Sequence, residues 1–170
     1  MIFTDRAVDM VADRIDVAIR IGRLLDSTLL AQRLGTVGHR LCASPEWLEG
    51  NGLVGPDSLE GLPIVVDTNQ PVTWSLTGPD EAKLQVRAQG RYVVNNTHAA
   101  LDACRAGLGL ALLPDFVGAA ALAKGELVEA LPGWKGHDLG LYVISQERRS
   151  AAPSVRALVE HVRGLLVPLG

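Results

Sequence analysis

Three consecutive polar residues, Asn95, Asn96 and Thr97, are the best candidates for ligand contacts. They follow residues 92–94, an apolar run that predicts a strand, and precede a helical pattern over residues 98–106. A helix N-terminus presents unpaired backbone N–H groups and a partial positive charge, so it attracts anionic groups. The alternative is that one Asn only caps the helix. If Thr97 contacts a ligand, Thr97→Val lowers the affinity and leaves the melting temperature nearly unchanged.

Two arginines and a helix start are further candidates. Arg20 and Arg23 flank a glycine at the end of an alternating apolar pattern, and either forked guanidinium could pair with a ligand carboxylate. The alternative is a solvated side chain or an ion pair with nearby Asp26. Ser44 and Pro45 open a short predicted helix, so capping competes with a ligand role at these two positions.

Aromatic side chains could supply an apolar wall to such a site. Phe116, Trp74 and Tyr142 are considered, although aromatic residues make up only 4% of the chain and core packing is the alternative for each. Phe116 and Tyr142 are candidate ligand contacts.

Catalysis and metal binding find no support in the sequence. It contains no G-x-S-x-G, H-E-x-x-H or G-x-x-x-x-G-K motif, so we expect no enzyme activity. Cys42 falls within a predicted strand and Cys104 on an apolar helix face, where a cysteine is ordinarily a small hydrophobe. The four histidines show no ligand spacing, and we expect neither a metal nor a cofactor.

Composition restricts the class of protein. A chain of 170 residues with 48% hydrophobic and 21% charged residues can bury a core without disulfides. The net charge is −3 and the Lys and Arg residues are scattered, so the chain lacks the basic stripe of a DNA-binding module. We find no membrane span and no secretion signal, and we expect a cytoplasmic location with no membrane partner.

Strand and helix patterns alternate along the chain, which predicts an α/β fold with parallel-rich sheets. Residues 108–113 are a near-continuous apolar run, the pattern of a strand buried on both faces of a parallel sheet. Gly107 is expected to end the preceding helix in the left-handed conformation. The stretch 67–79 is read as turns. The other predicted strands are 16–21, 29–34, 37–43, 63–66, 84–87 and 139–144, and the other predicted helices are 5–13, 44–49, 115–124 and a last one beginning at Ser154.

Four stretches, in order, resemble the effector-binding domain of LysR-type bacterial transcription regulators. They are residues 8–22, ending in Ile-Arg-Ile-Gly; residues 26–35 with 40–45, ending in Ala-Ser-Pro; residues 94–97 with 106–116, containing Gly-Leu-Gly-Leu-Ala-Leu-Leu-Pro; and residues 153–159.

The resemblance implies a two-lobed fold of the periplasmic-binding-protein type 2 class, with a small-molecule effector in the cleft between the lobes. Residues 1–43 and 139–170 would form the first lobe and residues 44–138 the second. Two strands would then cross a hinge, and a ligand that gains contacts with both lobes would bias an open–closed equilibrium. The start of the helix after residue 97 would face the cleft, at the carboxyl end of a parallel strand.

Complete members of the family begin with a winged helix-turn-helix, a linker helix and the first elements of the first lobe. None of these precedes Asp5, so we expect an incomplete first lobe and contact with promoter DNA only through the absent winged helix-turn-helix. The resulting hypothesis is a sensor of a small, anionic organic effector that acts within a homo-oligomer in the intact regulator. A stand-alone solute-binding protein of the same fold and a non-functional fragment are the alternatives.

Overall fold

A computed structural model describes residues 10, 12–13, 15–22, 30–52, 55–145 and 152–166. The chain divides into two compact units: Met1–Val37 with Asp138–Gly170, and Gly38–His137. Strand β3 (His39–Ala43) belongs to the second of these units, because it pairs with strands of that unit. The lobe boundaries expected at residues 43 and 139 stay a prediction. Most of the helix predicted over residues 5–13 lies outside the described residues.

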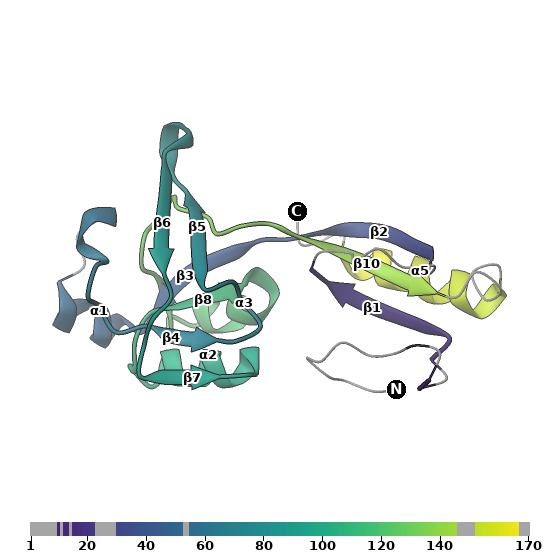
Figure 1. The fold of residues 1–170 in the computed structure, drawn as a ribbon, viewed down its shortest axis with the longest axis horizontal. Coiled ribbons are helices and arrows are strands. Elements are labelled where there is room, and N and C mark those ends of the chain that lie inside the picture. Colours follow the sequence, from purple (N-terminus) through teal and green to yellow (C-terminus); the bar gives the residue numbers. More distant parts are fainter. Residues whose placement is uncertain are drawn as a thin grey trace. The chain divides into compact units, whose positions relative to one another are not determined.

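In the described part of the first unit, a helix packs against an antiparallel sheet (Figure 1). Its strands are β1 (Val17–Ile21), β2 (Leu30–Val37) and β10 (Leu139–Ser145), in the order β1-β10-β2. Helix α5 (Pro153–Leu166) buries Val155 and Val159 against Val143 of the central strand. The apolar stripe that predicted this last helix is therefore the face that packs on the sheet.

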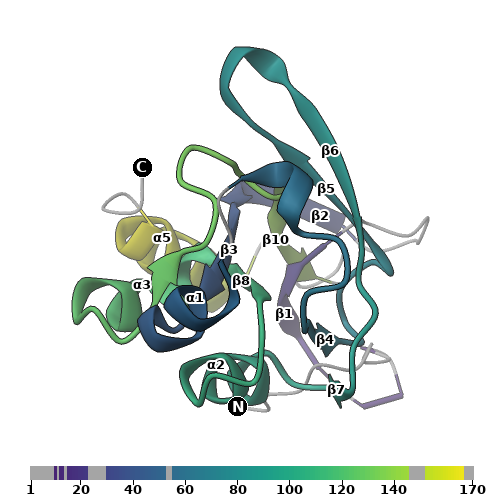
Figure 2. The same cartoon turned by 90° about the vertical axis from the view of Figure 1, so that its left-hand side faces the viewer.

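The second unit contains two groups of strands, one antiparallel and one parallel, which an isolated bridge joins into one sheet (Figure 2). Strand β3 lies between β8 (Ala111–Pro114) and β9 (Val128–Glu129), antiparallel to both. Strand β4 (Val65–Asp67) pairs in parallel with β7 (Tyr92–Val94). A parallel bridge between Ile64 and Leu110 joins these two groups of strands.

Both faces of this sheet are covered. Helices α2 (Thr97–Arg105) and α3 (Asp115–Ala123) pack on one face. The core on the other face includes residues of helix α1 (Pro45–Asn51), of a β-hairpin, and Leu59, which follows a short 3-10 turn η1 (Pro56–Ser58). The hairpin consists of β5 (Thr73–Thr77) and β6 (Lys83–Arg87), joined through a second 3-10 turn, η2 (Pro79–Glu81). Successive residues of the apolar run alternate between the two cores, Leu110 and Leu112 facing one and Ala111 and Leu113 the other.

Two expectations about the strands need correction. The sheets are mainly antiparallel within the described residues, not parallel-rich, because a continuous apolar run reports burial on both faces and carries no information about strand direction. The stretch 67–79 also contains a strand, β5, where turns were expected. Its alternation of exposed residues with buried Trp74 and Leu76 is a strand pattern, but the flanking Pro71, Gly78 and Pro79 obscured it.

Candidate functional site

Two loops meet where the parallel strands β4 and β7 end. The strands pair up to Asp67 and Val94, so their carboxyl ends lie at the same edge of the sheet, where ligands bind in open α/β folds. Just beyond that pair, the backbone N–H of Thr68 donates to the carbonyl of Val94 at 2.8 Å. The turn 67–70 and the segment 95–97 therefore lie side by side.

Asp67 connects the two loops through a buried carboxylate. The residue is only 4% exposed. Its Oδ1 accepts hydrogen bonds from the backbone N–H and the side-chain amide of Asn69, both at 3.0 Å, and its Oδ2 accepts one from the hydroxyl of Thr97 at 2.9 Å. The Asn69 amide also donates to the carbonyl of Asn95 at 3.0 Å. The position of the segment 95–97 is thus fixed by residues that the sequence analysis did not select.

Asn96 caps helix α2. Its Oδ1 accepts from the backbone N–H groups of His98 at 3.0 Å and Ala99 at 3.2 Å, and its backbone is extended, as an N-cap requires. The capping alternative therefore holds for Asn96. The side chain of Asn95 is exposed beside the cap, and contact of Asn95 and Thr97 with a ligand stays a prediction.

Gln70 adds a hydrogen-bond acceptor to the same turn. Its backbone N–H donates to the carbonyl of Asp67 at 2.9 Å, while its side-chain Oε1 is buried and has no hydrogen-bond partner among the described residues. A buried acceptor that lacks a donor costs about 1–3 kcal/mol.

Ser44 and Pro45 lie at the other end of helix α2. The hydroxyl oxygen of Ser44 accepts from a backbone N–H in the first turn of α1 at 3.3 Å, as a helix cap does. A surface pocket beside Ser44 and Pro45 is also lined by Arg105 and Gly107, where α2 ends. Nine helical residues rise roughly 13 Å. The structure therefore does not bring Ser44 and Pro45 together with Asn95, Asn96 and Thr97.

Candidate residues of the first unit lie on neighbouring strands. Arg20 of β1 stands directly opposite Tyr142 of β10, and Tyr142 is also paired with Arg33 of β2. The central tyrosine is thus flanked by an arginine on each side. Arg23 and its alternative ion-pair partner Asp26 lie outside the described residues.

The other two aromatic residues differ in burial. Trp74 is 1% exposed and belongs to the core, as its core-packing alternative expected. Phe116 lies in the first turn of α3 and is 47% exposed, on a different element from the turn 67–70 and the segment 95–97.

Both cysteines are buried in the core between the sheet and helices α2 and α3. The thiol of Cys104 donates to the carbonyl of Cys42 at 3.3 Å. The pKa of each thiol is raised from 9.0 to about 12, mainly by burial, and the nearby Glu129 carboxylate contributes to the raised pKa of Cys42. Neither residue supplies a thiolate nucleophile near neutral pH, and the prediction that both are core residues is confirmed.

Within the part of the chain that the structure describes, no group of three or more His, Cys, Asp or Glu residues is arranged to hold a metal ion. None of the described helices is long and apolar enough to cross a membrane.

The sequence matches the LysR substrate binding domain family over residues 2–166. An uncharacterized HTH-type transcriptional regulator of Haemophilus influenzae is 37% identical over 151 residues, which cover 86% of this chain and 52% of that protein. The HTH-type transcriptional regulator PtxR of Pseudomonas aeruginosa is 34% identical over 166 residues, covering 96% of this chain and 53% of PtxR. The chain thus spans about half the length of these relatives.

Several solved structures of transcription regulators also resemble this chain. Full-length AphB, a virulence activator of Vibrio cholerae and a member of the LTTR family, superposes with a TM-score of 0.79 at 25% identity, over 96% of this chain and 56% of AphB. The regulatory domain of Vibrio vulnificus AphB gives a TM-score of 0.72 at 26% identity, over 88% of this chain and 75% of that domain. The regulatory domain of CrgA from Neisseria meningitidis shares the fold, with a TM-score of 0.77 at 22% identity over 92% of this chain and 78% of that one.

Proposed function

The chain belongs to the LysR substrate binding domain family, and from this premise we propose that it senses a small organic effector at the carboxyl ends of β4 and β7. The two-lobed, type 2 periplasmic-binding-protein-like fold expected from the resemblance is confirmed by the likeness to LysR-type regulatory domains. The observation that carries the proposed site is the contact between the turn 67–70 and the segment 95–97, which Asp67 holds together.

The proposed ligand is an organic acid. The N-terminal end of helix α2 favours a negative group, and the exposed amide of Asn95 and the hydroxyl of Thr97 offer polar contacts beside it. The carboxylate of Asp67 offsets part of this attraction. It is buried, however, and its two oxygens already accept three hydrogen bonds, so it is partly screened from a ligand at the surface of the loops.

We propose that DNA binding and oligomerisation are properties of a longer, intact regulator. The chain has a net charge of −3, and its relatives are about twice as long, so we propose that promoter DNA is bound by another part of the intact regulator. A homo-oligomer in the cytoplasm is the form in which we expect that regulator to act. We propose no catalytic step for this domain, since its relatives are transcription regulators.

The test is a thermal-shift screen of the purified chain against small organic acids, each paired with its uncharged amide, for example benzoate with benzamide. A ligand that binds only the native state raises the melting temperature. We expect at least one acid to raise it and the matching amide to raise it less. The variant Asn95→Ala should reduce the shift, because it removes an exposed amide and leaves the backbone carbonyl that Asn69 contacts.

The matched control is Gln85→Ala, which removes an exposed amide on strand β6 of the same unit. It should leave the ligand-induced shift unchanged. A shift that survives Asn95→Ala in full would remove the segment 95–97 from the site. The absence of a cooperative melting transition in the unmodified chain would overturn the sensor proposal in favour of the fragment alternative.

A further inference from the structure

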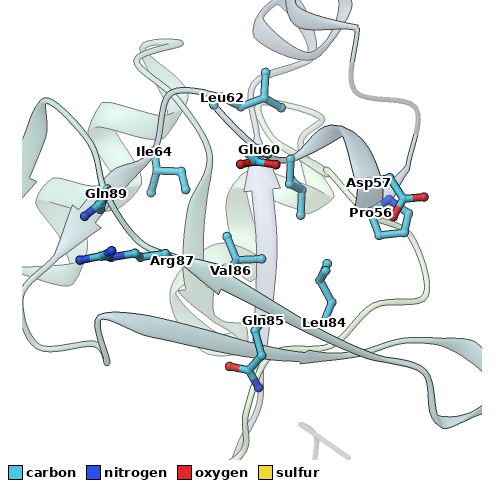
Figure 3. Close-up of a pocket in the computed structure, with 12 residues that line it drawn as sticks. Pro56, Asp57, Glu60, Leu62, Ile64, Leu84, Gln85, Val86, Arg87 and Gln89 are labelled. Atoms are coloured by element: carbon cyan, nitrogen blue, oxygen red, sulfur yellow. The ribbon is translucent and has the colours of Figure 1, made fainter.

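A groove of about 650 Å³ lies in the second unit between strand β6 and the segment that runs from η1 to β4 (Figure 3). One wall is formed by residues 84–87 and Gln89, and the other by residues 56–57, 59–62 and Ile64. These elements differ from the turn 67–70 and the segment 95–97. The groove is therefore separate from the proposed effector site.

In the part of the chain that the structure describes, one edge of strand β6 is unpaired. Among the described residues β6 pairs only with β5. The backbone N–H of Ala88 donates to the carbonyl of Val72 at 2.8 Å, so Val72 and Ala88 form the first hydrogen-bonded pair of the hairpin. Hydrogen-bonded and non-hydrogen-bonded pairs alternate in an antiparallel ladder, so Leu84 and Val86 bond to β5. By the same alternation, Lys83, Gln85 and Arg87 direct their backbone groups away from β5.

A second contact supports this assignment. Thr77 stands opposite Lys83, and it exchanges two backbone hydrogen bonds with Lys135, each at 2.8 Å, rather than with β6. The carbonyl of Arg87 accepts from the N–H of Gln89 at 2.9 Å. The N–H and carbonyl of Gln85 and the N–H of Arg87 thus lie on the edge of β6 that faces away from β5, and both residues line the groove.

The walls of the groove are apolar inside and charged at the rim. Figure 3 shows Leu84 and Val86 pointing from β6 toward the opposite segment, where Ile64 and Leu62 lie, and Gln85 pointing away. Two carboxylates, those of Asp57 and Glu60, belong to the opposite wall, and within the described part of the chain neither forms an ion pair. An occupant with apolar groups inside and positive charge toward that wall would complement both features.

We propose that this groove binds an extended segment of a partner polypeptide, which adds to β6 as a third strand of the hairpin sheet and carries lysine or arginine side chains for Asp57 and Glu60. Strand addition supplies affinity through main-chain hydrogen bonds and selectivity through alternate side chains. The five residues of β6 extend for roughly 16 Å at about 3.3 Å per residue, which accommodates a segment of about five residues.

The competing interpretation is that the edge is protected. Lys83 and Arg87 are charged residues on an edge strand, and such residues discourage pairing with other chains. Protection would explain the charges on β6. It does not explain the carboxylates of Asp57 and Glu60 on the facing wall, which attract the cationic strand that the proposal requires.

The experiment is an NMR titration of the ¹⁵N-labelled full chain with the peptide acetyl-Val-Lys-Val-Lys-Val-amide and its Glu counterpart, acetyl-Val-Glu-Val-Glu-Val-amide. The Lys peptide should shift the amide signals of Gln85 and Arg87 and bind more tightly than the Glu peptide. Gln85→Pro removes an N–H that faces the groove without removing a bond to β5, and it should weaken binding about tenfold. Glu60→Lys should reverse the preference between the peptides.

The matched control is Ser75→Pro. Ser75 stands opposite Gln85 in a non-hydrogen-bonded pair, so its N–H points away from β6 and from the groove. This variant places the same backbone restriction on the hairpin and should bind the Lys peptide like the unmodified chain. No shift at Gln85 or Arg87 with either peptide in the unmodified chain, or an affinity for the Lys peptide that is unchanged in Gln85→Pro, would overturn the proposal. Melting curves of all variants verify that the hairpin variants stay folded.

Discussion

The hydroxyl of Thr97 donates a hydrogen bond to the buried carboxylate of Asp67 at 2.9 Å, and this bond fixes the start of helix α2 against the end of strand β4. The two residues are separated by 30 positions in the sequence. Thr97 therefore has a structural role, whether or not it also contacts a ligand. A substitution of Thr97 is therefore expected to change the stability of the fold, and any change in ligand affinity must be compared with that loss of stability.

Thr97→Val should destabilise the chain by about 1–3 kcal/mol, because it leaves a buried carboxylate oxygen without its donor at nearly constant side-chain volume. Thr97→Ser keeps the hydroxyl and should cost much less. Urea denaturation measures the stability lost in each variant, which appears as a lower midpoint of unfolding at an unchanged denaturant slope. This replaces the sequence-based expectation that Thr97→Val leaves the melting temperature nearly unchanged. Equal midpoints for Val and Ser would mean that the bond to Asp67 contributes nothing.

Two substitutions of Asn96 can separate its role as a helix cap from the effect of charge on ligand binding. Asn96→Asp retains an oxygen for the N–H groups of His98 and Ala99 and adds a negative charge at the helix N-terminus, so stability should be maintained. An organic acid bound beside the helix would be repelled, and its affinity should fall about fivefold at low salt. Asn96→Ala, by contrast, removes the cap and should cost about 1 kcal/mol. Calorimetric titration with an acid found in the screen, beside melting curves, distinguishes these effects.

Local patterns predicted the elements of the second unit well. The capping residues before α2 and the apolar runs on either side of it correctly indicated β7, α2 and β8, because each signal lies within a few residues of the element it marks. The burial of the two thiols was equally predictable, since Cys42 falls within a strand and Cys104 on an apolar helix face.

Contacts between distant residues were not predictable from one sequence. The Asp67-x-Asn69 pattern marks a turn, but nothing local indicates that the carboxylate also binds Thr97. The open edge of β6 depends on the pairing partners of a hairpin whose first strand was hidden by its flanking prolines. Strand direction was missed for the same reason: burial is readable from residue type, whereas pairing is a property of two segments.

The buried thiols should make stability fall in alkaline solution. The pKa of Cys42 and of Cys104 is raised from 9.0 to about 12 in the native state. Below pH 9 the thiols keep their protons in both the native and the unfolded chain. Above it the unfolded chain loses them and the native chain does not, so stability falls by up to about 1.4 kcal/mol per pH unit for each thiol until pH approaches 12.

Urea midpoints at pH 8, 9 and 10 test this pH dependence. The doubly substituted variant Cys42→Ala, Cys104→Ala should show a shallower decline than the unmodified chain, whatever its absolute stability. The comparison is of slopes because the substitutions also leave small cavities, which lower stability at every pH. Parallel declines in the two proteins would mean that other groups cause the alkaline loss.

The end of helix α2 depends on a glycine in the left-handed conformation. Gly107 has a φ of +75°, as its position after the helical pattern predicted. Gly107→Val should destabilise the chain by roughly 1–2 kcal/mol, since a β-branched residue is strained there. An added Cβ would lie 3.5 Å from the Ser44 hydroxyl, an ordinary contact, so the cost of the first atom is conformational rather than steric.

Two substitutions make this interpretation testable by urea denaturation. Gly107→Asn should cost less than Gly107→Val, because asparagine tolerates the left-handed region better than valine. Gly50→Ala is the control: Gly50 lies within helix α1, a Cβ there meets no atom within 4 Å, and alanine should stabilise by about 0.5–1 kcal/mol. If valine and asparagine at position 107 cost the same, side-chain volume beside Ser44 would be the cause instead of the backbone conformation.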